Sequence, residues 1–222
     1  MNLTYLFDPL CGWCYGAGPV LKHVAGLPGI RLDLVPTGLF ARGDGRQLDR
    51  QISEHIWSMD QRISALSGQE FSESYRTKVL GQPEARLSSA AATLALTAVT
   101  ETNPEAELDA LSAIQTARYV GGLDITSDLV LADCLIDLKL TAAAELFADR
   151  SASLIAKNAA RIEQGEAAMA LHHLNGVPAL LHDRGGQYRP IDSGLLFGNP
   201  ERLTAALAIR EIENQTEKGM KP

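Results

Sequence analysis

The sequence predicts an α/β fold in which a long helical segment is inserted into a small sheet domain. Residues 3–7 form an apolar run typical of a strand, residues 15–26 carry a helical pattern, and residues 30–35 alternate as a second strand. This order predicts one parallel crossover unit. Strand patterns return only at residues 177–181 and 187–190. We therefore expect residues 1–45 and 166–222 to form one discontinuous domain and residues 46–165 to form an inserted helical domain.

Helical periodicity dominates the inserted segment. Apolar residues recur at steps of three and four, and Gly68 is a plausible helix end. Asn103 followed by proline predicts a helix start, because asparagine caps helices and proline suits the first helical position. Gly165 is a candidate interruption of the last long helix. The helices expected here cover residues 47–66, 88–100, 103–119, 127–138 and 151–173.

The C-terminal part returns to sheet and ends in a helix. Residues 183–186 read Asp-Arg-Gly-Gly and predict the turn of a hairpin between the last two strands. Asn199 and Pro200 repeat the cap-and-proline signal, so we expect a final helix over residues 199–214. Residues 215–222 are polar and are expected to fray.

Composition limits the classes of partner. The 222-residue chain is 45% hydrophobic and can bury a substantial core, and its net charge of −7 argues against nucleic acid or an anionic membrane as a partner. The N-terminus lacks the pattern of a secretory signal, and no apolar run reaches the roughly 20 residues that span a bilayer. We expect a cytoplasmic protein. The sequence carries no indication of its oligomeric state.

The most informative motif is the cysteine pair of residues 11–14, Cys-Gly-Trp-Cys, which follows the first strand and opens the first helix. The first thiol would lie among the unpaired N–H groups of the helix start, where the helix dipole favours a thiolate. This placement is typical of thiol–disulfide exchange. We expect Cys11 to be the nucleophile and Cys14, one turn further into the helix, to be the resolving thiol.

A structural zinc site is the rival interpretation of the cysteine pair. Zinc needs four ligands, and this motif supplies two. Cys134 is interpreted as a small buried hydrophobe on the apolar side of its helix with Leu131 and Leu138. The histidines form no second closely spaced half-site and include one adjacent pair; they are His23, His55, His172, His173 and His182. No metal site is therefore expected.

Other polar residues near the motif admit two interpretations. Asp8 would cap the helix or bond the loop, or would help to remove a proton from Cys14. His172 and His173 lie in the expected last turn of a helix, where a cation complements the dipole; the alternative is that one of them approaches the thiols.

The element order and two motifs resemble the DsbA-like branch of the thioredoxin superfamily. The motifs are residues 11–16, Cys-Gly-Trp-Cys-Tyr-Gly, and residues 176–178, Gly-Val-Pro. More narrowly, the chain resembles bacterial cytosolic members described as FrnE-like or predicted protein-disulfide isomerases. The resemblance implies a thioredoxin-like α/β fold with a large all-helical insertion domain. It also implies a cis-proline loop at Val177 and Pro178 that faces the cysteines.

The resemblance further implies roles for these residues. Trp13, Val177 and Pro178 would contact the substrate, with Val177 offering its backbone to an extended chain. Gly12 and Asp8 would modulate the pair. The alternatives are that Trp13 is ordinary core packing and that Pro178 is a trans proline opening an edge strand.

The function expected is a thiol–disulfide oxidoreductase or isomerase that uses the Cys11/Cys14 couple on protein or small-molecule disulfides. No tightly bound cofactor is expected, and glutathione or a thioredoxin-type protein would be the redox partner. Kappa-class glutathione transferases and 2-hydroxychromene-2-carboxylate isomerases share this topology, but usually carry serine at the position of Cys11 and lack the second thiol. A non-catalytic module that senses redox state is the third hypothesis. The direction of electron flow and the client are left open.

Overall fold

Four strands form the main sheet of the computed structural model, which describes residues 1–43, 45–83 and 85–208. The strand order is β2-β1-β5-β6, with β1 parallel to β2 and antiparallel to β5, and with β5 antiparallel to β6. The strands are β1 (Asn2–Phe7), β2 (Arg31–Pro36), β5 (Ala179–Arg184) and β6 (Gln187–Pro190). The parallel pair is the predicted crossover unit, and β5 with β6 is the predicted hairpin.

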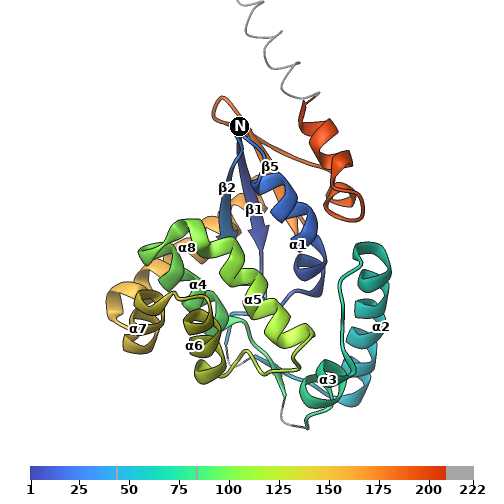
Figure 1. Ribbon diagram of the computed structural model, residues 1–222, viewed down its shortest axis with the longest axis vertical. Coiled ribbons are helices and arrows are strands. Elements are labelled where there is room, and N and C mark those ends of the chain that lie inside the picture. The colour runs from blue at the N-terminus through green and yellow to red at the C-terminus, as the bar shows by residue number, and fades with distance from the viewer. Residues whose placement is uncertain (44, 84, 209–222) are drawn as a thin grey trace, which may run out of the picture.

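Helices account for most of the chain between β2 and β5. Figure 1 shows α2 and α3 on the flank next to α1, and α6 and α7 on the opposite flank. The helices are α1 (Gly12–Ala25), α2 (Arg50–Ser67), α3 (Glu73–Tyr75), α4 (Ala90–Thr102), α5 (Glu107–Tyr119), α6 (Asp128–Asp137), α7 (Thr141–Asp149) and α8 (Ala152–Leu171). Short turns of other helix types are η1 (Arg76–Leu80), η2 (Pro104–Ala106) and η3 (Ser193–Leu196).

Strand β1 is buried on both faces, which explains its nearly continuous apolar sequence. Leu3, Tyr5 and Phe7 point into the core shared with α1, α4 and α5, because alternate residues of a strand face opposite sides. Leu6 points the other way and joins a smaller cluster with Leu181, against which residues of α8 pack. The sheet therefore lies between two helical layers, and the loop after β1 emerges inside the protein.

The predicted α/β fold with a helical insertion is confirmed, with differences in detail. Helix α1 starts at Gly12, directly after the first cysteine, and includes Pro19. A helix does follow Asn103, but its side chain makes no capping hydrogen bond, and the turn η2 precedes α5. A two-residue ribbon inside the insertion, β3 (Arg46–Gln47) with β4 (Arg86–Leu87), was not expected.

Helix α8 is continuous, so the expected interruption at Gly165 is wrong. Gly165 is buried, and a Cβ added there would lie 2.2 Å from the carbonyl oxygen of Pro36 at the end of β2. Glycine is therefore needed for a close helix–strand approach and not for a break. The expected boundary between residues 165 and 166 falls inside α8, and the division into two domains stays a prediction.

Two assignments made from helical periodicity are corrected. Leu138 is exposed, and Leu135 takes the buried place beside Leu131, while Cys134 is half-buried. α6 ends at Asp137, so Leu138 falls outside its last turn. Neither His172 nor His173 lies in the last turn of α8. His172 is the C-cap residue of this helix, and His173 follows it with a positive φ of 52°.

The hairpin and the final helix follow the sequence signals. Gly185 and Gly186 have φ of 65° and 90°, and the Gly186 N–H donates to Asp183 Oδ1 (2.7 Å), which closes the turn. The Glu201 N–H donates to Asn199 Oδ1 (2.9 Å), and residues 201–208 are helical. The expected end of this helix at residue 214 and the polar tail of residues 215–222 lie outside the described residues. Within the described ranges, no helix is both long and apolar enough to cross a membrane.

Candidate active site

Both cysteines of the pair lie at the start of α1, inside the protein. Cys11 is the N-cap residue and makes no side-chain capping hydrogen bond, and its backbone carbonyl accepts from the Tyr15 N–H (3.1 Å). Cys11 is 7% exposed and Cys14 is 1% exposed. Cys11 is therefore the slightly more exposed of two buried thiols, and the expected roles of an outer and an inner thiol stay predictions. The N–H groups of the first turn and the positive end of the helix dipole lie beside Cys11.

The Cys11 thiol faces the residue that precedes Pro178. Its Sγ donates to the carbonyl oxygen of Val177 at 3.6 Å, across 166 residues of sequence. The Val177–Pro178 peptide bond is cis, and β5 begins at Ala179, directly after it. The structure thus brings together the two motifs that the sequence separates most widely.

Cys14 lies deeper, in contact with β1. Burial raises the pKa of the Cys14 thiol well above its usual value, and the neighbouring Cys11 raises it further. Two hydrogen bonds to this thiol, from the backbone of Asp8 and from the hydroxyl of Tyr5, lower its pKa and so oppose the rise. The Tyr5 hydroxyl also donates to the Cys14 carbonyl oxygen (3.3 Å). The thiolate of Cys14 would therefore be stabilised by nearby hydrogen-bond donors but would have almost no contact with solvent.

Asp8 organises the loop that leads to Cys11. Its carboxylate is fully buried and accepts hydrogen bonds from the Leu10 N–H (2.9 Å), the Phe40 N–H (3.0 Å) and the Ser89 hydroxyl (2.8 Å). Burial raises the pKa of Asp8, and these three donors oppose the rise. The geometry corresponds to the loop-bonding interpretation, while a role as proton acceptor for Cys14 stays a hypothesis.

Replacement of Asp8 by alanine is expected to destabilise the fold. Three donors would lose their acceptor, and buried donors without a partner cost about 1–3 kcal/mol each, so we expect a loss of at least about 3 kcal/mol in the free energy of unfolding. Urea unfolding followed by circular dichroism measures the change. Asp149→Ala, at an exposed aspartate, is the matched control. An Asp8→Ala midpoint equal to that of the wild type would show that these hydrogen bonds contribute nothing.

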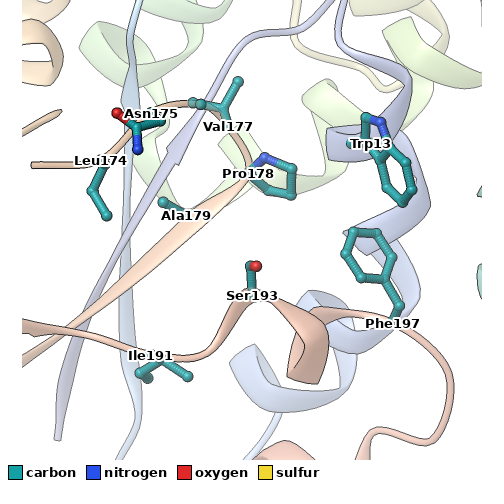
Figure 2. Close-up of a pocket in the computed structure, with 10 residues that line it drawn as sticks. Trp13, Leu174, Asn175, Val177, Pro178, Ala179, Ile191, Ser193 and Phe197 are labelled. Atoms are coloured by element: carbon teal, nitrogen blue, oxygen red, sulfur yellow. The ribbon is translucent and has the colours of Figure 1, made fainter.

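A pocket of about 450 Å³ opens beside Pro178. Figure 2 shows Trp13 from α1 and Phe197, after η3, on one side of it and Pro178 near its centre. The Trp13 and Phe197 rings meet edge to face, with centroids 5.3 Å apart. Of the expected substrate-contact residues, Trp13, Val177 and Pro178 all line this pocket, and Trp13 is partly exposed there. Cys11 does not line this pocket, but its thiol donates a hydrogen bond to the carbonyl oxygen of Val177, which does line it.

The inserted helices hold the cysteine helix and its loop. A Cβ on Gly16 would lie 2.5 Å from Ile63 of α2, so α2 packs closely against the glycine face of α1. The Tyr119 hydroxyl of α5 donates to the Leu10 carbonyl oxygen (2.8 Å). The Gln115 side chain donates to the Pro9 carbonyl oxygen (3.5 Å). The segment just before Cys11 is therefore fixed by side chains of the insertion.

Sequence reasoning missed several residues of this site. Tyr5, Ser89 and Tyr119 looked like ordinary parts of a strand and two helices, and no local signal links them to Cys11. His172 and His173 are absent from the lining of the pocket. Over the described ranges, no three His, Cys, Asp or Glu side chains are grouped as a metal ion would need.

Several solved structures have folds similar to that of this chain. A cytosolic disulfide reductase, DsbM from Pseudomonas aeruginosa, is 29% identical, with 95% of this chain and 98% of that chain covered at a TM-score of 0.84. The structural neighbours of this chain match the DsbA-like branch of the thioredoxin superfamily, as the sequence motifs predict. The same reductase solved with GSH matches this DsbA-like protein at a TM-score of 0.81. The likeness supports a thiol–disulfide oxidoreductase, and the thioredoxin-like fold with a helical insertion is confirmed.

More distant structures share the fold of the DsbA-like protein. A putative protein disulfide isomerase from Nitrosomonas europaea is 22% identical, with 96% of this chain and 98% of that chain covered at a TM-score of 0.78. A 2-hydroxychromene-2-carboxylate isomerase is 14% identical, with both chains fully covered, at a TM-score of 0.57. No family model and no curated protein matches the sequence. The narrower FrnE-like assignment stays a prediction.

Proposed function

We propose that this protein is a cytoplasmic thiol–disulfide reductase that works through a Cys11/Cys14 dithiol–disulfide couple. The observation that carries the proposal is the position of Cys11, at the N-terminus of α1 with its thiol on the Val177 carbonyl oxygen. The likeness to a reductase named as cytosolic supports the direction of electron flow and the compartment. Neither a tightly bound cofactor nor a resident metal is part of the proposed reaction.

In the proposed reaction, the Cys11 thiolate attacks one sulfur of a substrate disulfide. A mixed disulfide forms, and the other substrate sulfur leaves as a thiolate that takes up a proton. Cys14 loses its proton and attacks the Cys11 sulfur, which releases the second substrate thiol and leaves the Cys11–Cys14 disulfide. Two electrons have then passed from the enzyme to the substrate. Glutathione or a thioredoxin-type protein would return them.

The proposed substrate site is the pocket beside Pro178. An extended peptide or a small thiol would place its cysteine near Cys11 and pair its backbone with that of Val177. The apolar rings of Trp13 and Phe197 would contact the neighbouring part of the substrate. The structure of DsbM with GSH supports a low-molecular-weight thiol as substrate or redox partner. A protein disulfide fits the same chemistry.

A redox titration tests the proposal. The protein, as the Cys134→Ser variant so that two thiols remain, is equilibrated across a series of reduced and oxidised glutathione, alkylated, and analysed by mass. We expect both thiols to disappear together, with a midpoint near the thioredoxin value of about −270 mV. A midpoint of about −180 to −120 mV would contradict the reductase and favour an isomerase or an oxidant.

The same experiment separates the other hypotheses. Absence of a reversible couple would end the oxidoreductase proposal. Tight glutathione binding without mixed-disulfide chemistry would then favour the glutathione transferase or isomerase hypothesis. Slow oxidation of Cys11 that no substrate accelerates would favour a redox sensor.

A further inference from the structure

One buried carboxylate of the insertion lies against the cysteine motif. Asp60 of α2 is 4% exposed, and its Oδ1 lies 2.6 Å from the place that a Cβ would occupy on Gly12. Ile63 and Phe71 complete the contact around Gly12 at 3.3 and 3.6 Å. Glycine between the cysteines therefore lets the Asp60 carboxylate approach the first turn of α1, immediately after Cys11.

Two aromatic residues and one arginine surround this carboxylate. The Tyr75 hydroxyl donates to Asp60 Oδ2 (2.9 Å). The Arg118 guanidinium, in a residue 2% exposed, lies 5.3 Å from the Tyr75 ring centroid and 5.7 Å from that of Tyr119. The Tyr119 hydroxyl in turn donates to the Leu10 carbonyl oxygen next to Cys11. The network connects α2, α3 and α5 to the nucleophile.

Charge at this position matters because α1 has no acidic residue in its first turn. An ionised Asp60 would be the anion that the helix N-terminus attracts, and a Cys11 thiolate would be a second anion at the same terminus. Each negative charge disfavours the other. Tyr119 is within electrostatic reach of both groups: burial raises the pKa of Tyr119, the charges of Tyr75, Asp60 and Cys11 add to the rise, and Arg118 opposes it.

Asp60 itself titrates near neutral pH. Burial raises the pKa of Asp60 to about 7, against the opposing effects of the Tyr75 hydrogen bond and the Arg118 charge. The titratable or charged groups that act on Asp60 are Tyr75 from α3 and Arg118 from α5, and the charge of Asp60 in turn acts on Tyr119 of α5. Glu70 precedes α3, is exposed, and acts on Tyr15.

We propose that Asp60 is a positioning residue of the thiol–disulfide reaction, whose carboxylate opposes negative charge on Cys11 until it takes up a proton. The inference rests on the proposed function in one respect, that Cys11 is the nucleophile. The inserted helices then do more than hold the loop, because they place an ionisable group that sets how readily Cys11 becomes a thiolate.

The test is the pH profile of Cys11 alkylation in Asp60→Asn. The reduced protein reacts with iodoacetamide between pH 5 and 9, and Cys11 is quantified by peptide mass, with thiolate absorbance as a second readout. At pH 8 we expect Asp60→Asn to react about three- to tenfold faster than the wild type, the effect of removing one charge near a helix terminus. At pH 5, where Asp60 is protonated, the two rates should agree.

Two further variants keep the proposal falsifiable if Asp60→Asn folds poorly. Tyr75→Phe removes the hydrogen bond that stabilises the Asp60 carboxylate, so ionisation of Asp60 and its effect on Cys11 should move to higher pH. Glu54→Gln removes the same charge from an exposed position on α2 and should leave the profile unchanged.

The proposal is overturned if the Asp60→Asn profile superposes on that of the wild type, or if the two rates differ equally at pH 5 and pH 8, as a packing change would produce. A Tyr75→Phe profile identical to the wild type would count against it in the same way. Alkylation needs neither a disulfide substrate nor a redox couple. Failure here is therefore distinguishable from failure of the glutathione titration.

Discussion

Cys11→Ser is expected to abolish disulfide reduction, with a loss of at least roughly a thousandfold in turnover. A serine hydroxyl is not ionised near neutral pH, so the helix N-terminus has no thiolate to stabilise and no mixed disulfide forms. The measurement is the rate of reduction of oxidised glutathione or of a model protein disulfide under a fixed supply of reductant. The fold should be preserved, because serine is close in size to cysteine and its hydroxyl can donate to the Val177 carbonyl oxygen in place of the Cys11 thiol.

The control for this variant is Cys134→Ser. Cys134 lies half-buried on α6, outside the pocket, and its replacement should keep the wild-type rate. Circular dichroism and thermal unfolding of Cys11→Ser exclude misfolding as the cause of lost activity. If Cys11→Ser turned over substrate at the wild-type rate, the proposed mechanism would be wrong.

Cys14→Ser is expected to convert the protein into a trap for its substrate. Cys11 can still attack a disulfide, but no inner thiol remains to resolve the mixed disulfide. Intact mass after incubation with oxidised glutathione should show one added glutathionyl group per chain. With a protein substrate, the complex should survive on a non-reducing gel and disappear on addition of dithiothreitol.

The environment of Cys14 adds a pH dependence to this step in the wild type. Burial raises the pKa of the Cys14 thiol, so the resolving attack should accelerate as the pH rises. The Asp8 backbone and the Tyr5 hydroxyl limit the rise in pKa. The lifetime of the mixed disulfide, measured by acid quenching and mass, should accordingly shorten between pH 6 and 9 in the wild type and stay unchanged in Cys14→Ser. Equal lifetimes in both proteins would show that Cys14 is not the resolving thiol.

The features predicted correctly are those with local signals. Strand β1 and helix α1 follow from a change of apolar period at the cysteine pair, and the hairpin follows from Gly185 and Gly186. Errors occurred where one signal has two physical origins. Gly165 looked like a helix break and proved to be a contact with Pro36. Asn103 carried a capping signal, yet its side chain makes no cap and a tighter turn precedes α5.

The sequence by itself determined the chemistry: two cysteines at a helix start and a Val-Pro pair at the head of a strand. Only the tertiary structure decided what surrounds them. Ser89 lies 81 residues from Asp8 along the chain, and Asp60 lies 48 residues from Gly12, yet each pair is in contact. Such contacts depend on which helix faces pack together, and packing is a property of many weak interactions that leave no mark at a single position. The cysteine motif can therefore be recognised in one sequence, whereas the side chains that contact it and its loop cannot.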